Sequence, residues 1–339
     1  MSTDNPAVSN NNNSTPQPIQ STLTELFSST VVASVINRKF DTPIVLRSDM
    51  SLTEAIAILS QAQISSAPVV SSTDNAIHFI LDFKNICEIV VRYIEASSNK
   101  HSTLMERLFS LEKGADYDAL LSDLTLDLEH VTFQGKEDGI PCIRPSDSLL
   151  HACNIFSKGV HRILVIDDDG NFDGVISQSD LIQFILKRFD VTKPYLQKTL
   201  AQLNLARKDT VCIPWTESVF DGVKRMVDKK VSSLGLLDEE NLLAGVFSMT
   251  DIKYIFHFRD FQCLKDSLCA FVCGIRQISE ALKGKTHYPL FSVRPDTTLD
   301  AVVHKLVSTH SHRVYVSEDM EPVGVVTLTD VIRSLPLFQ

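Results

Sequence analysis

The sequence contains one pattern four times, and this repeat limits the possible fold more than any other feature. Each copy runs from a short apolar segment through an amphipathic stretch to two more apolar segments, and ends at a polar residue. The amphipathic stretches begin at Leu52, Leu149, Val219 and Leu299, and the final polar residues are Asn85, Asp180, Asp251 and Asp330. The separations are 33, 31, 32 and 31 positions. A unit of this size cannot close a core alone, so the copies are expected to stack and to form clefts between them.

Each copy predicts a β-α-β-β-α unit. In copy two, SLLHACNIFSKG is typical of an amphipathic helix, and HRILVIDDDGNFDGVIS of two strands joined at an Asp-Gly turn. We expect the last helix to begin just after Asp180. The predicted units cover residues 38–97, 139–197, 206–265 and 285–339, and their connections group copies one and two as one pair and copies three and four as another. The predicted fold class is α/β, with small mixed repeats.

The regions outside the repeats carry weaker signals. Residues 1–20 are polar and rich in Asn, Ser and Pro, which predicts a disordered tail. Leu104, Leu108 and Leu111 recur at helical spacing, which predicts a helix within residues 97–138. The seven cysteines are an odd number without CxxC spacing, which favours reduced, buried thiols over disulfides. The helical trio Cys263, Cys269 and Cys273 is expected to lie in the core.

Charge and hydropathy exclude several classes of protein. The net charge of −10 argues against a general binder of nucleic acid or anionic membranes, although it permits a local basic pocket. No apolar run reaches the ~18–20 residues of a membrane span, and the N-terminus lacks the pattern of a secretory signal. We therefore expect an intracellular protein of the cytoplasm, and also of the nucleus, with neither nucleic acid nor membrane as a partner.

Several segments together resemble the CBS domain. They are VHRILVID and SHRVYVSED in copies two and four, VSSLGLLD in copy three, ISSAPVV in copy one, and the junction EALKGKTHYPLFSV before copy four. Four copies in two pairs (Bateman modules) are similar to the gamma subunit of AMP-activated protein kinase. This resemblance implies a flat pseudo-symmetric disc and a non-catalytic subunit. It also implies that AMP, ADP or ATP binds between the repeats and that kinase alpha and beta subunits are partners.

The acidic residues that end copies two to four have two interpretations. Ser, Thr and Asp are the preferred N-caps of helices, so Asp180, Asp251 and Asp330 fit a purely structural role. In the resembling family this Asp binds the ribose hydroxyls of an adenine nucleotide, because a carboxylate can accept from two neighbouring hydroxyls. The two roles are compatible if the preceding hydroxyl residue takes the cap. Those residues are Ser179, Thr250 and Thr329.

Adjacent basic residues occur at equivalent positions of copies two and four: His161–Arg162 and His312–Arg313. A structural interpretation places them on an edge strand with each Arg paired to a carboxylate. The functional interpretation is phosphate binding, since Arg offers a bidentate donor and His a shorter, titratable one. If the pairs stack about a pseudo-twofold axis, copies two and four could bring the four side chains near one centre.

Other positions depart from the gamma-subunit pattern or support it weakly. Lys285 stands where the family has a further phosphate-contacting base, although a lone Lys is usually a solvated surface residue. Copies one and three have serine pairs, Ser65–Ser66 and Ser232–Ser233, where the even copies have His-Arg. Their hydroxyls could support a ribose or phosphate, or simply pack. Asn85 replaces the acidic residue of copy one and could bind a hydroxyl only without charge.

No enzyme motif is present, and we expect no catalytic domain, because the repeats cover most of the sequence. The sequence lacks a glycine-rich phosphate loop, a GxSxG elbow and an HExxH helix. The spacing His310–Ser311–His312 has no Cys or carboxylate beside it, so no metal site is predicted. The alternative to a nucleotide sensor is a four-repeat scaffold for a kinase or phosphatase with vestigial sites, which the substitutions at Asn85 and Ser65 favour.

Overall fold

The computed structural model describes residues 19–36, 44–62, 64–74, 76–88, 91, 140–258, 261–283 and 292–337. Most of the predicted tail, the helix predicted within residues 97–138, and Lys285 lie outside this part of the chain. No helix among the described residues combines the length and apolar character that a membrane crossing requires.

The predicted order of strands and helices is present in all four copies, and the α/β fold class is confirmed. Copy one contains β1 (Leu46–Arg47), α2 (Leu52–Gln61), β2 (Ser66–Val70), β3 (Ile77–Asp82) and a helical segment from residue 83. Copy two contains β4 (Cys142–Ile143), α6 (Leu149–Ser157), β5 (Arg162–Ile166), β6 (Phe172–Ser177) and α7 (Gln178–Lys187). Copy three contains β7 (Cys212–Pro214), α9 (Val219–Asp228), β8 (Ser233–Leu237), β9 (Leu243–Ser248) and α10 (Met249–Phe258). Copy four contains β10 (Ser292–Val293), α12 (Leu299–Ser308), β11 (Arg313–Glu318), β12 (Glu321–Thr327) and α13 (Leu328–Ser334).

Every copy forms its own three-stranded sheet with the same pairing. The first strand lies parallel to the second, and the third lies antiparallel to the second. The second strand is therefore central, and it is the strand that begins at Arg162 in copy two and at Arg313 in copy four. The Asp-Gly turn predicted in copy two is present, with Gly170 at φ +86°, a value that glycine adopts without a steric penalty.

Side-chain caps begin the first helix of each copy. Ser51, Ser148, Ser218 and Thr298 occupy the N-cap positions, and each side chain accepts a backbone N–H three residues later. Apolar residues then recur at helical spacing: in α6, Leu149, Ala152, Cys153 and Phe156 are all buried. The polar start and the apolar stripe together fix where each helix begins and which face it buries.

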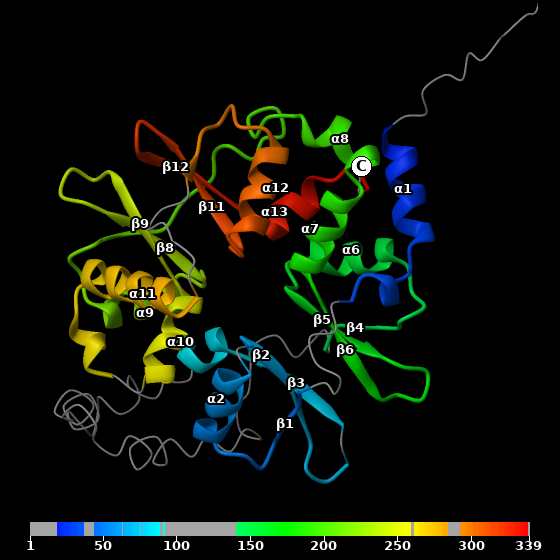
Figure 1. The fold of residues 1–339 in the computed structure, drawn as a ribbon, viewed down its shortest axis with the longest axis horizontal. Coiled ribbons are helices and arrows are strands. Elements are labelled where there is room, and N and C mark those ends of the chain that lie inside the picture. Colours follow the sequence, from blue (N-terminus) through cyan, green and yellow to red (C-terminus); the bar gives the residue numbers. More distant parts are fainter. Residues whose placement is uncertain are drawn as a thin grey trace, which may run out of the picture.

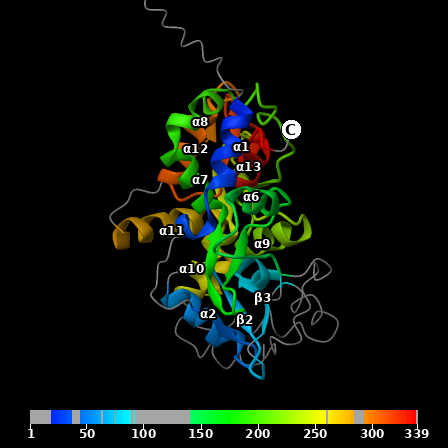
Figure 2. The same ribbon diagram turned by 90° about the vertical axis from the view of Figure 1, so that its right-hand side faces the viewer.

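The helices of different copies share two hydrophobic cores. One core joins residues of copies one and three, where α2 packs against α10. The other joins copies two and four, where α13 packs against α6 and α7, and α12 against α7. Viewed down the shortest axis, the four copies occupy four quadrants (Figure 1), and the molecule is narrower when it is turned by 90° (Figure 2).

Connecting helices join one copy to another. Helix α1 (Ile19–Ser29) packs on copy two rather than on the copy that follows it, with Phe27 edge-on to Phe184 at 5.7 Å between ring centroids. Helix α8 (Phe189–Leu196) packs against α12 of copy four, and the Leu299 N–H donates to the Lys198 carbonyl. The connection after copy three forms the 3-10 helix η3 (Phe261–Lys265) and α11 (Leu268–Lys283).

Copies three and four meet where the segment before β7 crosses β12. At this crossing the Lys208 N–H donates to the Val323 carbonyl at 3.3 Å. A Cβ atom at Gly324 would overlap the carbonyl oxygen of Ala206, so the two backbones touch without room for a side chain.

We predict that Gly324→Ala destabilises the fold by roughly 1–3 kcal/mol, because the added methyl group forces the crossing segment away from β12. The matched control is Gly274→Ala in α11, where the added atom meets nothing within 4 Å. Removing a helical glycine there should be neutral or stabilise by up to ~1 kcal/mol. Urea unfolding measures both changes. Equal midpoints for the two variants would contradict the close approach.

Candidate functional site

The carboxylates that end copies two and four lie inside the first turn of a helix. Helix α7 begins at Gln178, before Asp180, so the prediction that this helix starts after Asp180 is wrong. The N-caps are Ser177 and Thr327 rather than Ser179 and Thr329, because the cap is three residues before each Asp. In each capping box, one carboxylate oxygen of the Asp accepts from the backbone N–H and the hydroxyl of the capping residue.

Copy three has the same arrangement at Asp251. Its Oδ2 accepts from the Ser248 N–H and the Ser248 hydroxyl, both at 2.8 Å. The hydroxyl of Thr250 lies 2.8 Å from that of Ser248, so Thr250 supports the turn without occupying the predicted cap position. In all three copies the helix cap uses one carboxylate oxygen, Oδ2, and leaves Oδ1 outside the cap.

Copy one reverses the chemistry of this turn. Asp82 stands at the position of the capping hydroxyl, and its Oδ1 accepts the Asn85 N–H at 2.9 Å. The Asn85 side-chain oxygen accepts the Asp82 N–H at 3.2 Å. The negative charge is therefore retained three residues earlier than expected. The signal in the sequence is the spacing Asp82-x-x-Asn85, which repeats Ser177-x-x-Asp180 with the acidic residue moved to the other end.

The hydroxyls of the first turns differ in their surroundings. Ser179 is half-buried, whereas Thr329 is buried and bonds the side chain of Gln178 across copies two and four, with its Oγ1 2.9 Å from Gln178 Nε2. The same Gln178 nitrogen donates to the Val160 carbonyl at 2.8 Å. Thr329 thus joins two copies through a contact that no local sequence pattern indicates.

The arginines of the even copies reach the serines of the odd copies. Arg162 donates to the Ser65 hydroxyl at 2.6 Å. Arg313 donates through Nη1 to Ser233 at 2.9 Å and through Nη2 to Ser232 at 2.7 Å. The interpretation of an edge strand with Arg paired to a carboxylate is wrong, because both strands are central and the hydrogen-bond partners are hydroxyls. Each arginine joins the two copies of its pair.

The four basic residues of copies two and four gather close enough to influence one another. The protein around the His312 ring removes water and, with Arg162, Arg313, His161 and Lys253, lowers the pKa of His312 to about 4. Desolvation, Arg162 and Arg313 likewise hold the pKa of His161 below its ordinary value. Both histidines are exposed residues, so solvent reaches the cluster although the surrounding protein desolvates part of each ring. The two His-Arg pairs therefore lie within electrostatic reach of one another.

Carboxylates lie within electrostatic reach of both guanidinium groups. Desolvation lowers the pKa of both arginines, while Asp82 and Asp180 oppose that shift at Arg162. Tyr315, Asp330 and Asp251 oppose it at Arg313. Burial also raises the pKa of Asp180 above its ordinary value, against hydrogen bonds from Ser177 and the charge of Arg162. The site thus combines cationic donors with anionic acceptors within one electrostatic cluster.

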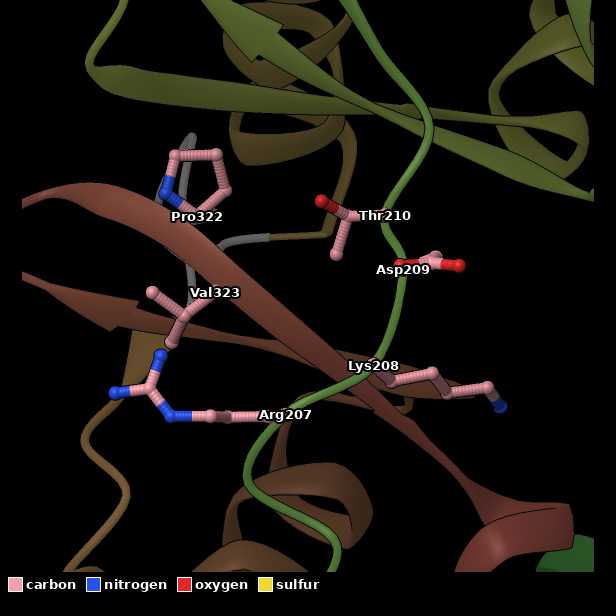
Figure 3. Close-up of a pocket in the computed structure, with 6 residues that line it drawn as sticks. All are labelled: Arg207, Lys208, Asp209, Thr210, Pro322 and Val323. Atoms are coloured by element: carbon pink, nitrogen blue, oxygen red, sulfur yellow. The ribbon is translucent and has the colours of Figure 1, made fainter.

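Tyr315 and Lys208 also take part in the contacts between copies three and four, although no sequence motif marks them. Tyr315 is buried, with its hydroxyl 3.3 Å from the Ser233 hydroxyl, and burial raises the pKa of Tyr315 to about 12. Lys208 places its ammonium group on Asp330, 122 positions away in the chain. The segment that carries Lys208 lines a hollow beside β12, with Pro322 and Val323 on the opposite side (Figure 3). No local pattern in the sequence connects residues so distant.

The cysteines are free thiols, but not all are buried. Cys87 and Cys153 are buried, and burial raises the pKa of both thiols well above the ordinary range. Cys263 and Cys269 are half-buried and Cys273 is exposed, so the assignment of this trio to the core is wrong for Cys273. Within the described ranges, no three His, Cys, Asp or Glu side chains are grouped as metal ligands.

Comparison with known proteins identifies the repeated unit. The family profile "CBS domain" matches residues 32–80, 137–187 and 284–337. Copy three lies between the last two of these ranges and has the same strand order as the others. The archaeal protein MJ1225 of Methanocaldococcus jannaschii, described as a candidate homologue of g-AMPK, has a similar fold. Its TM-score is 0.67 at 14% identity, over 90% of this chain and 99% of that one.

Curated relatives share sequence over different lengths. Protein sds23 of Aspergillus clavatus is 29% identical over 200 residues, which are 58% of this chain and 38% of that protein. Protein sds23/moc1 of Schizosaccharomyces pombe is 23% identical over 318 residues, or 85% of this chain and 75% of that protein. The match thus spans well under half of the Aspergillus relative.

We predict that the depressed pKa of His312 makes the fold less stable in acid. An unfolded histidine takes up a proton near pH 6.5 and folded His312 only near 4, so stability is lost as the pH falls from about 6.5 to 4. His312→Gln should flatten this part of the stability curve, as urea unfolding at several pH values would show. Carboxylates titrate in both proteins and cancel in the difference. If the unfolding free energies of the parent and the variant changed in parallel with pH, the lowered pKa of His312 would be contradicted.

Proposed function

Because the CBS-domain profile matches three of the four copies, we propose that the chain is a non-catalytic regulatory module that binds an adenine nucleotide between its repeats. The ligand class is AMP, ADP or ATP. The observation that carries the proposal is the convergence of His161, Arg162, His312 and Arg313 beside the carboxylates that begin the final helices. A nucleotide needs both kinds of group at once.

The proposed roles follow from the chemistry of each side chain. Arg162 and Arg313 bind phosphate oxygens, because a guanidinium is always charged and donates in a planar fork. The histidines add N–H donors, and an anionic ligand raises their pKa and so favours the protonated form. Asp180 and Asp251 accept ribose hydroxyls through the oxygen that the helix cap leaves over, and Asp330 does so only when the Lys208 ammonium group leaves that oxygen. Asn85 and Asp82 provide the corresponding acceptors in copy one.

Regulation follows if the ligand favours one arrangement of the copies over another. Arg162 already bridges copies one and two, and Arg313 bridges copies three and four. A phosphate that binds these arginines must compete with the serine hydroxyls or share their donors, and so changes contacts between copies. We propose that a protein kinase complex with alpha and beta subunits responds to this change. Co-purification of those subunits with the chain would test the partner.

A scaffold with vestigial nucleotide sites is the second candidate function. The internal hydrogen bonds favour it, since Ser232, Ser233 and Lys208 already satisfy Arg313 and Asp330 without any ligand. The two candidates differ in one measurable property. A sensor binds nucleotide and a scaffold does not, whereas both can bind a protein partner.

We predict that Arg162→Gln weakens nucleotide binding by roughly 10- to 100-fold, because it removes a charge-assisted hydrogen bond to phosphate. Isothermal titration calorimetry of the purified chain with AMP, ADP and ATP measures the effect. The matched control is Arg144→Gln in the same copy. Arg144 is exposed and lies 3.7 Å from Asp168, so its loss should leave affinity unchanged. No heat with the parent chain at millimolar nucleotide would favour the scaffold instead, and equal affinities in both variants would remove Arg162 from the site.

A further inference from the structure

Asp330 differs from the carboxylates of copies two and three in what it already binds. In all three residues, Oδ2 accepts hydrogen bonds from the residue three positions earlier. Asp330 also receives the ammonium group of Lys208, whose Nζ lies 3.0 Å from Oδ1 and 3.2 Å from Oδ2. Within the part of the chain that the structure describes, Asp180 and Asp251 hold no lysine in this way.

Lys208 is held in place by the backbone of its own segment. Its N–H donates to the Val323 carbonyl, and the close approach of Ala206 to Gly324 presses the segment onto β12. Arg207 forms two hydrogen bonds with Glu318, at 2.8 and 2.9 Å. Figure 3 shows the side chains of Arg207 and Lys208 leaving the segment in opposite directions. The ammonium group therefore starts from an anchored position, although 51% of its side chain is exposed.

The ammonium group satisfies Asp330 as a ribose would. Two neighbouring ribose hydroxyls offer two O–H donors to a carboxylate, and a lysine ammonium offers three N–H donors and a positive charge. The Asp330 side chain is only 13% exposed, so its attraction to Lys208 is screened less than that of a surface pair. Burial acts to raise the pKa of Asp330, but hydrogen bonds from Thr327 and Lys208 outweigh it and hold the pKa below its ordinary value. At Asp180, burial prevails and raises the pKa.

A separate observation on the same pair of copies agrees with this difference. Arg313 donates from both terminal nitrogens to Ser232 and Ser233, whereas the bond of Arg162 to Ser65 uses one nitrogen. Copy four would offer Asp330 as the acceptor and Arg313 as the donor to a nucleotide. Both residues already have hydrogen-bond partners within copies three and four.

We propose that Lys208 is a built-in occupant of the ribose position at Asp330, which closes this position to nucleotide while the equivalent carboxylates at Asp180 and Asp251 stay available. This inference rests on the proposed function and names the selectivity of its sites. A nucleotide that enters at Asp330 has to displace the ammonium group, and the resulting loss of a charged hydrogen bond weakens binding there relative to the other positions.

The test compares the number of AMP molecules bound by the parent chain and by Lys208→Met, measured by equilibrium dialysis and calorimetry. Methionine keeps most of the apolar stem and removes the charge. We expect about one more AMP per chain in the variant, because two lone pairs of Asp330 become free. The added site should disappear in Lys208→Met combined with Asp330→Asn. Lys229→Met, at an exposed position after α9, is the matched control and should bind as the parent does.

The difference in bound AMP between the parent chain and Lys208→Met tests the role of Lys208. Binding of AMP to the parent chain alone tests the proposed function. If the parent binds AMP and Lys208→Met binds the same number, the occupant proposal is wrong. If Lys208→Met binds fewer or binds more weakly, Lys208 contacts the ligand phosphate instead, which also overturns it. If the parent binds none and the variant binds one, the occupant proposal stands and the parent chain is not a sensor. Absence of binding in both overturns both proposals.

Discussion

The whole arrangement depends on helix faces that only become buried when different copies meet. Neither hydrophobic core belongs to one copy: residues of copies one and three form the first, and residues of copies two and four form the second. The polar contacts run in the other direction, from copy two to copy one and from copy four to copy three. Apolar burial thus joins copy one to three and copy two to four, while the arginine bridges join copy one to two and copy three to four.

The first turn of each final helix explains how one carboxylate can serve stability and binding. A helix leaves four N–H groups without intrahelical partners at its start, and a residue at the third position can accept the N–H of the cap. Asp180 does so through Oδ2 alone. Copy one obtains the same reciprocal pair from Asp82 and Asn85, with the charge at the other position. A structural role for the carboxylate therefore does not exclude a role in ligand binding.

The sequence predicted what depends on local periodicity and failed where contacts join distant segments. Strand order, helix faces and the Asp-Gly turn follow from spacing within about 30 residues. The predicted helix start just after Asp180 was wrong, because the polar N-cap residue and the polar residue three positions later cannot be told apart by residue type alone. Arg162 and Ser65 are 97 positions apart, and Lys208 and Asp330 are 122 apart. These contacts depend on how two distant backbone segments pack against each other, and the sequence of one segment does not show this packing.

Equivalent positions in a repeat protein need not be equally available to a ligand. The backbone places a carboxylate or its amide substitute at the same turn in every copy, because the cap stabilises every helix in the same way. What lies opposite that turn comes from another segment, and this segment is free to vary without loss of the fold. In copy four it brings a lysine ammonium with the donors and charge that saturate a carboxylate. Selection among the four positions can therefore arise from the connecting segments, while the repeats themselves keep nearly the same chemistry.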